Sequence, residues 1–464
     1  MQDETWGSVV QNKLQFSFIV ALCIAAASAG HAQAQSAAAF TLRDAVAMAL
    51  DKNPDRKIAQ SDVAAARIGS RMARTSLLPN LGFSEGVTRG DDPVYVFGTL
   101  LRQQQFGQAN FALNNLNRPH PANNFTSRFA GQWVAFDSFR TELEMRKTDL
   151  QSRSAQASLS RSDQEIAHHV VASYEGILFA AKYVDVAQHA VDTAKALLDS
   201  SKSRVDAGMA VDSDQLVASS NLAERQQERI ESEGNLEIAW AQLERAIGAP
   251  IPAEQRRLQD LAEKTFDVRP LGDTVSLALQ SRQDRESLKQ QLAAQKVGVQ
   301  SAKSGYGPTI STFGSWERDR ASIAGSGGNN WTAGAELRVD LLPAAKRQQV
   351  AAAKIALERM EAASTSADDE IRLEVTQAWY AHRSASQKLE VARASVAQAE
   401  ESLRILKDRY ESGLATVTEL LRVEDAQRQS SANYWQAVFG NTLTYADLQF
   451  AMGTLNPANQ EDLQ

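Results

Sequence analysis

The feature that most constrains this chain is an internal duplication. Two long segments repeat the same residue types in the same order and at a constant spacing, as these pairs illustrate: Ile166 and Ile371, Val170 and Val375, Leu198 and Leu403, Gly208 and Gly413, Gly248 and Gly453. Repeated segments indicate one supersecondary unit used more than once, with its apolar face covered by its neighbour. The fold is therefore expected to contain two copies of one unit.

Each copy reads as helix, strand, strand, long helix, glycine turn and helix. The long helices, near 138–205 and 344–411, carry apolar residues seven apart and small residues on a second seam, which is typical of coiled coils. At 1.5 Å per residue each is about 100 Å long, more than one globular core needs. The predicted organisation is a signal peptide at 1–34, a first repeat at 35–247 with strands near 80–97 and 125–136, a joining segment at 248–271, a second repeat at 272–453 with strands near 308–320 and 330–341, and a tail at 454–464.

The predicted strands have two different faces. In the stretch WTAGAELRVDL, Trp331, Leu337 and Val339 alternate with polar residues. Phe125, Phe129 and Trp133 lie in the same way on one face of the first-repeat strand. Strands of about 9–11 residues with this alternation suit a lipid-facing barrel, although a half-buried soluble sheet would alternate too. Four strands cannot close alone, and open edges are not tolerated in lipid, so the barrel is expected to be shared between chains, twelve strands coming from three.

The N-terminus indicates export. Lys13 precedes an apolar run that ends near a small-residue cleavage site, Ala32-Gln33-Ala34. This pattern is typical of a secretory signal peptide, with a membrane anchor as the alternative. The single cysteine, Cys23, lies inside that run, so the mature chain is expected to have no disulfide and no cysteine-based metal site.

Composition and motifs favour neither an enzyme nor a nucleic-acid-binding protein. The net charge is −7, and the chain offers no basic patch for nucleic acid. No phosphate loop, nucleophile elbow or zinc motif is present, and the adjacent pair His168-His169 points in two directions on a helix. We therefore expect no catalytic residues, no cofactor and no metal.

Three stretches resemble the TolC-like outer membrane efflux proteins in their sequence and order: TLRDAVAMALDKNP from Thr41, RVDAGMAVDSDQL from Arg204 and RYESGLATVTELL from Arg409. The third stretch is the second-repeat copy of the second. The resemblance covers nearly all of the mature chain. It implies a mostly α fold with a membrane β part: a homotrimer with an α-helical periplasmic tunnel and a shared twelve-stranded outer-membrane β-barrel. It also implies an exit duct of a tripartite efflux or type I secretion system, with an inner-membrane transporter and a periplasmic adaptor as partners.

The resemblance also assigns functional positions. A periplasmic gate is implied at Tyr410, Asp214, Ser213 and Glu419. Ala415 and Arg422 depart from the family pattern, replacing a gate arginine and a second acid. The alternative for the acids is ordinary first-turn stabilisation of a helix, and for Tyr410 it is core packing. The hairpin tips that would contact the adaptor are Arg204, Gly208, Leu216, Arg409, Gly413 and Leu421.

Two questions stay open from the sequence. A periplasmic coiled-coil adaptor or scaffold without a pore would also be exported, long and helical, although it would not need paired alternating strands. Within the duct class, the transporter rather than the duct determines whether the cargo is a drug, a metal or a protein. The first repeat also carries extra sequence between Pro79 and about Ser127, expected to form an extracellular loop that either shapes the outer mouth or is inert.

Overall fold

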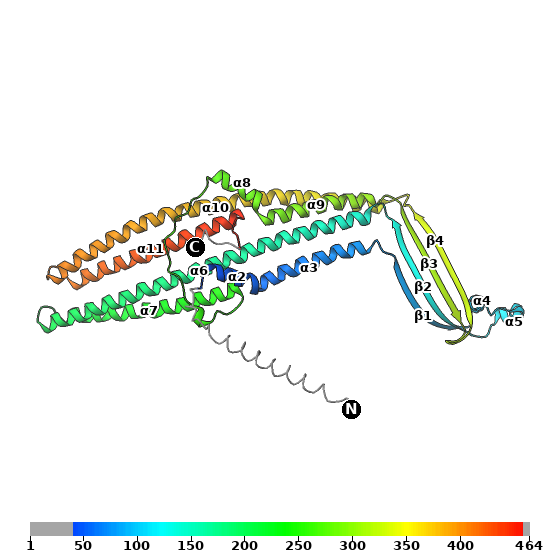
Figure 1. Cartoon of the computed structure of the whole chain (residues 1–464), viewed down its shortest axis with the longest axis horizontal. Coiled ribbons are helices and arrows are strands. Elements are labelled where there is room, and N and C mark those ends of the chain that lie inside the picture. Colours follow the sequence, from blue (N-terminus) through cyan, green and yellow to red (C-terminus); the bar gives the residue numbers. More distant parts are fainter. Residues whose placement is uncertain (1–39, 458–464) are drawn as a thin grey trace, which may run out of the picture.

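The computed structural model describes residues 40–457. The predicted signal peptide and the end of the tail lie outside this range. The molecule is elongated, with a small sheet at one end and two helical hairpins at the other (Figure 1). The second repeat follows the order of the first: two short helices, two strands, a long helix and a returning helix. The predicted duplicated helix–strand–strand–helix unit is therefore confirmed.

The helices match most predicted positions. The long helices are α6 (Arg140–Asp206) and α10 (Ala344–Glu411), and each returns through a second helix, α7 (Asp212–Ile247) or α11 (Val417–Met452). The prediction of one opening helix per copy was wrong. The first splits into α2 (Leu42–Lys52) and α3 (Pro54–Thr75), because the side chain of Asn53 caps α3 and Pro54 follows. The second splits into α8 (Leu271–Ser281) and α9 (Gln283–Ser304).

Equivalent arginines hold the two splits. Arg56 pairs with Asp163 of α6 at 2.7 Å and also donates to the carbonyl of Leu50. In the second copy, Arg285 pairs with Asp368 of α10 at 2.6 Å and donates to the carbonyl of Leu279. Each arginine thus ties a short-helix break to the long helix of its own copy.

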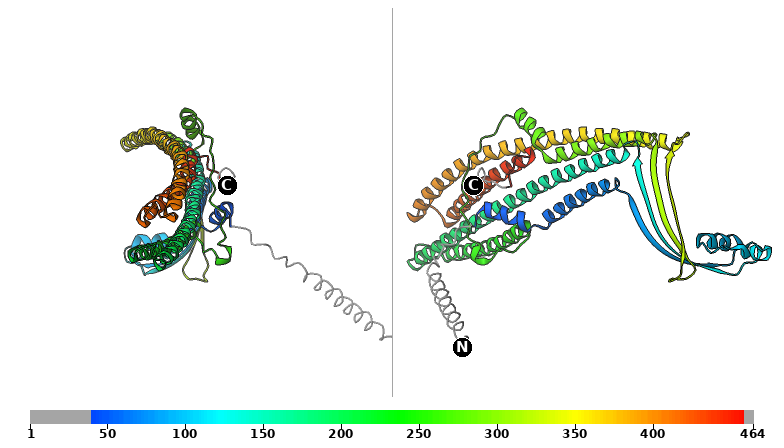
Figure 2. Two further views of the ribbon diagram at one scale, coloured as in Figure 1. Left: turned by 90° about the vertical axis from the view of Figure 1, so that its left-hand side faces the viewer. Right: turned by 45° about the vertical axis from the view of Figure 1, so that its right-hand side comes forward.

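The long and returning helices, with α3 and α9, form one curved layer rather than a compact bundle. Viewed end-on, they lie along an arc (left panel of Figure 2). Towards the sheet, α9 packs between α6 and α10, while α3 packs on α6 alone. Towards the tips, α6 packs on both α7 and α11. The layer therefore has the shape of a wall segment with two lateral edges.

The sheet has four antiparallel strands in the order β1-β2-β3-β4. Their bounds are β1 Asn80–Gly90, β2 Ala122–Phe136, β3 Thr309–Arg320 and β4 Gly327–Arg338. Two predicted boundaries were wrong. β1 ends at Gly90 rather than near 97, because Asp92 caps a helix that opens with Pro93. β4 ends at Arg338, so Val339 lies just beyond the strand.

The extra sequence of the first repeat is folded. It contains the helix α4 (Pro93–Arg102), the short 3-10 helix η1 (Gln108–Phe111) and α5 (Leu113–Asn117), which lie at the far end of the sheet (Figure 1). Phe106 packs edge-to-face on both Phe97 and Phe111, with ring centroids 4.7 and 5.1 Å away. The insertion therefore has its own small apolar cluster.

The largest core lies midway along the helices, where α2, α6, α7 and α11 meet the joining segment. That segment includes the 3-10 helix η2 (Ala253–Gln255) and inserts Ile251 and Leu261 into the core. The hydroxyl of Tyr174 donates to the carbonyl of Phe40 at 2.7 Å, and burial raises the pKa of Tyr174 to about 12. Glu175 is buried beside Lys264 at 3.7 Å, and burial raises the pKa of this glutamate.

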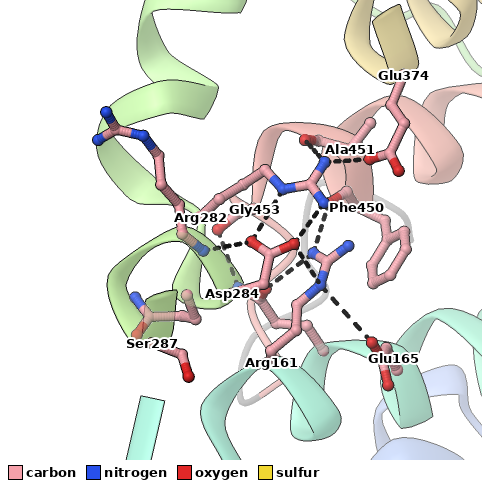
Figure 3. Close-up of polar contacts among 12 residues, drawn as sticks. Arg161, Glu165, Arg282, Asp284, Ser287, Glu374, Phe450, Ala451 and Gly453 are labelled. Atoms are coloured by element: carbon pink, nitrogen blue, oxygen red, sulfur yellow. Dashed lines mark hydrogen bonds and ion pairs between the residues drawn. The ribbon is translucent and has the colours of Figure 1, made fainter. Parts of the chain in front are cut away.

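Two buried arginines join the repeats where α11 ends (Figure 3). Arg161 of α6 donates to the carbonyl of Phe450 at 3.0 Å, and its guanidinium lies 3.7 Å from the Phe450 ring centroid. Arg282 contacts Asp284 and Glu374, and it donates to the carbonyl of Ala451. These contacts supply hydrogen-bond donors in the last turn of α11, where the carbonyl of Phe450 also accepts from the capping amide of Gly453.

Among the helices of residues 40–457, none is long and apolar enough to cross a lipid bilayer.

Candidate functional site

The two hairpin turns have the same geometry. At each, glycine follows the long helix with a positive φ, +70° at Gly208 and +76° at Gly413. Met209 then donates its amide hydrogen to the carbonyl of Arg204, and Leu414 to that of Arg409, each at 2.8 Å. This is the Schellman arrangement, which glycine adopts without Cβ strain. The predicted glycine turns are therefore present at both hairpin tips.

The hairpins meet at Tyr410, which is 7% exposed. It belongs to a buried apolar cluster with Leu197 of α6, Ala218 of α7, and Val417 and Leu420 of α11. The hydroxyls of Tyr410 and Ser201 are 3.4 Å apart, at the long end of hydrogen bonding. Tyr410 thus joins the end of α10 to the first hairpin through both apolar and polar contacts.

Arg204 makes the stronger polar contact at this junction. Its Nη1 donates to the carbonyl of Tyr410 at 3.0 Å, and its guanidinium carbon lies 4.9 Å from the Tyr410 ring centroid. The equivalent arginine, Arg409, is exposed and has no such contact among the described residues. Sequence reasoning placed Arg204 only at the adaptor-contacting tip and missed Ser201 as a partner of Tyr410. The signal for Ser201 was its place on the small-residue seam of α6.

The acidic candidates occupy first turns of helices. Asp214 lies in the first turn of α7, and neither it nor the exposed Ser213 makes a side-chain hydrogen bond within residues 40–457. Glu419 accepts hydrogen bonds from the amide and hydroxyl of Thr416, at 2.8 and 3.0 Å, forming a capping box. These bonds, the amide bond first, hold the pKa of Glu419 below its usual range. One chain therefore brings Tyr410 to Ser201 and Arg204, but not to Asp214.

The remaining tip candidates divide by exposure. Leu216 is 70% exposed, whereas its repeat equivalent Leu421 is partly buried against the Tyr410 cluster. Met209 and Leu414, next to the two glycines, are 68% and 70% exposed. The tips therefore present apolar side chains to solvent that the fold of one chain does not cover.

A second polar link joins the hairpins on the sheet side of Tyr410. Arg225 of α7 is buried, and it pairs with Glu228 at 2.8 Å and with Asp425 of α11 at 3.4 Å. Arg428 of α11 reaches the same Glu228 at 3.6 Å. Both hairpins thus share one alternating ion network, which fixes α7 against α11 where they lie on either side of α6.

At the other end, one face of the sheet carries an aromatic row, and nearer the insertion the same face carries the ion pair of Glu85 with Arg320. Phe83, Phe129, Trp316 and Trp331 occupy one row across the four strands, because each is paired with the next. Phe129 is 54% exposed and Trp331 78%. The other predicted outward residues lie on this face or continue it: Phe125, Trp133, Leu337 and Val339. Charged residues such as Arg128 and Glu317, which pair directly, lie on the opposite face.

Comparison with known proteins identifies the family. The family model described as outer membrane efflux protein matches residues 45–249 and 274–454. The alkaline protease secretion protein AprF of Pseudomonas aeruginosa is 22% identical over 438 residues, covering 92% of this chain and 87% of that one. The chain belongs to the outer membrane efflux protein family, and it is an outer-membrane exit duct of the efflux and secretion type.

Solved structures share the fold. A membrane protein from Pseudomonas aeruginosa matches with a TM-score of 0.75 at 19% identity, covering 89% of this chain and 93% of that one. The CmeC outer membrane channel of Campylobacter jejuni matches with a TM-score of 0.73 at 16% identity, covering 91% and 87%. The open state of the MtrE outer membrane channel of Neisseria gonorrhoeae gives 0.73 at 16% identity, covering 90% of each.

Proposed function

We propose that this outer membrane efflux protein works as one third of a homotrimeric duct. The observation that carries the proposal is the arc of helices, which has two uncovered lateral edges. At one edge, α3 packs only on α6, whereas its repeat equivalent α9 packs on both α6 and α10. The second neighbour of α3 is therefore missing within one chain. Supplying the missing neighbour from another copy closes the wall into a tube.

The same reasoning applies to the sheet. β1 and β4 each pair on one side only, and an unpaired edge in lipid costs several kcal/mol for each unsatisfied backbone group. Three copies joined edge to edge make a twelve-stranded barrel, with the aromatic face towards outer-membrane lipid and the charged face towards a wet lumen. Phe83, Phe129, Trp316 and Trp331 then form an aromatic girdle around it.

The hairpin tips provide the docking end. Leu414 and Leu216 expose apolar side chains there, which suits a periplasmic adaptor that bridges the duct to an inner-membrane transporter. Three Glu419 carboxylates brought towards one axis would favour cations over anions. Asp214 would act at this gate only through contacts that one chain does not contain.

We assign closure of the gate to the contact between Arg204 and Tyr410, supported by Ser201. Opening requires the end of α10 to move away from α6, which breaks the hydrogen bond from Arg204 and the ring contact together. The ion network around Arg225 and Asp425 then acts as the fixed point about which the tips separate.

The transporter determines which cargo enters the duct. The name of the relative AprF concerns the secretion of a protease, whereas the family description concerns efflux. We propose that the duct passes either small molecules or an unfolded protein, according to the transporter and adaptor it meets.

Conductance in a planar bilayer tests this function. The wild-type protein is expected to insert and give a small, cation-preferring conductance. Arg204→Ala is expected to raise it, because the end of α10 loses its polar tie to α6. Arg409→Ala, at the equivalent but exposed position, is the matched control and should leave it unchanged. Failure of the wild type to insert would overturn the duct, and equal conductance in both variants would overturn the gate assignment alone.

A further inference from the structure

The insertion of the first repeat is anchored to the sheet by buried polar groups. Gln103, which follows α4, is 2% exposed, and its Nε2 donates to the carbonyl of Asn123 at 2.7 Å and to Oδ1 of Asn124 at 2.9 Å. Buried side-chain amides are costly unless they are hydrogen-bonded. Both partners belong to β2, so Gln103 fixes the insertion to that strand.

The anchor continues across the sheet to Asp319. This β3 carboxylate is fully buried and accepts from Nδ2 of Asn124 at 2.6 Å, from the hydroxyl of Thr126 at 3.0 Å and from Nδ2 of Asn330 at 3.2 Å. Three donors from two neighbouring strands therefore surround one carboxylate, which keeps this end of the sheet rigid under the insertion.

The end of α4 also reaches β4. The backbone carbonyl of Arg102 accepts a hydrogen bond from Nδ2 of Asn330 at 3.2 Å. The guanidinium of Arg102 lies 3.4 Å from the carboxylate of Glu317. A Cβ on Gly328 would lie 2.0 Å from the carbonyl oxygen of Arg102. Only glycine permits so close an approach, so the chain is built for α4 to lie against β4 at this point.

All these anchors lie on one face of the sheet. Asn124, Thr126 and Asp319 share the face of Arg128 and Glu317, because Thr126 pairs with Asp319 and Arg128 with Glu317. This is the charged face, opposite the aromatic row. In the proposed trimer it lines the lumen, so the insertion folds inward over the outer mouth rather than outward over the membrane.

We propose that the insertions of three chains form a second constriction of the duct, at its outer mouth. This inference rests on the proposed trimeric duct. A helix with its side chains is about 10–12 Å across, so each α4 removes that much width from its side of the opening. The constriction limits the size of solutes that enter the lumen from outside, independently of the gate at the hairpin tips.

The second repeat supplies the variant that tests this proposal. It joins its two strands through the short stretch 321–326, whereas the first repeat uses 91–121. Replacing 91–121 by the 321–326 sequence removes the insertion and keeps a connection known to this fold. A less drastic variant, Gln103→Ala, removes the buried anchor and leaves the segment in place.

The readout is labelling of a single cysteine in intact cells. Thr332 is exposed on the lumen face of β4, two residues deeper along the strand than Asn330, which is the partner of Glu317. Thr332→Cys is treated from outside with a small charged maleimide or with a maleimide on a long polyethylene glycol chain. Ala324→Cys, at the exposed outer hairpin, is the control that both reagents should label in every background.

We expect the small reagent to label Thr332→Cys in all backgrounds. The polymer reagent should label it severalfold faster once the insertion is removed, and to a smaller extent in the Gln103→Ala background. Equal polymer labelling with and without the insertion would overturn the outer constriction. If the small reagent does not reach Thr332→Cys even without the insertion, the face is not a water-filled lumen and the duct proposal itself fails.

Discussion

A pair of cysteines at Val87 and Ala335 should cross-link neighbouring copies into a covalent trimer. Val87 lies on the edge strand β1 and Ala335 on the opposite edge strand β4. Within one chain these strands are three strand spacings apart, roughly 14 Å, too far for a disulfide. A bond between them therefore reports contact between two chains.

The internal duplication supplies the register. Asn80 pairs with Gln132 in the first repeat, and Thr309 pairs with Arg338 in the second. Counted along the strands from these equivalent pairs, Val87 corresponds to Trp316 and Ala335 to Phe129. Phe129 and Trp316 are direct partners where β2 of the first repeat meets β3 of the second. The same join between chains makes Ala335 the partner of Val87.

The expected separation is short enough for a disulfide. Directly opposite residues on antiparallel strands have Cβ atoms about 4.5–5.5 Å apart, and a disulfide needs about 3.5–4.5 Å, within reach of small adjustments. Phe83→Cys with Ala335→Cys is the matched control. Phe83 lies on the same face but four residues along β1, about 13 Å from the predicted partner.

The assay is mild oxidation in the native membrane followed by denaturing electrophoresis without reductant. The sole cysteine of the chain is in the predicted signal peptide, so the background is clean. Bands should stop at the trimer, because linking two of three seams already joins all three chains. Bands above the trimer, or equal linking by the Phe83 control, would refute the register and the closed ring.

Two further predictions concern stability. Gly453→Ala should destabilise the protein by about 1–3 kcal/mol in urea unfolding, since φ there is +71° and the new Cβ would lie 2.9 Å from Cα of Arg282. Gly440→Ala, inside α11 with open space around it, should instead gain about 0.5–1 kcal/mol; similar losses in both would contradict this explanation. His382 is buried, and burial holds its pKa below the usual value. The unfolded chain therefore binds the proton first, and stability is lost as pH falls from about 6.5 through the lowered pKa. His382→Gln should flatten the fall of thermal midpoint between neutral pH and about pH 5, and an unchanged slope would exclude this residue.

The sequence predicted the features that depend on local pattern. The bounds of α10 agree with prediction, because uninterrupted heptads between a proline and a glycine signal specify a helix without reference to distant residues. The break at Arg282 could not be predicted in this way. No proline stands there, and the break is held by contacts with Asp284, Glu374 and Ala451, of which the last two are far away in the chain.

By itself the sequence determined the duplicated unit, its long helices and paired strands, and the two-faced character of the sheet, because repeat spacing and side-chain alternation are written along the chain. Only the tertiary structure decided how equivalent residues differ. Arg204 contacts Tyr410 while Arg409 is exposed, and Leu421 packs between the hairpins while Leu216 is 70% exposed. The two copies take unequal places in one curved layer, so equivalent positions have different neighbours. The packing of the insertion on one face of the sheet also needed the structure, because the buried contacts of Gln103 and Asp319 join segments that are distant in sequence.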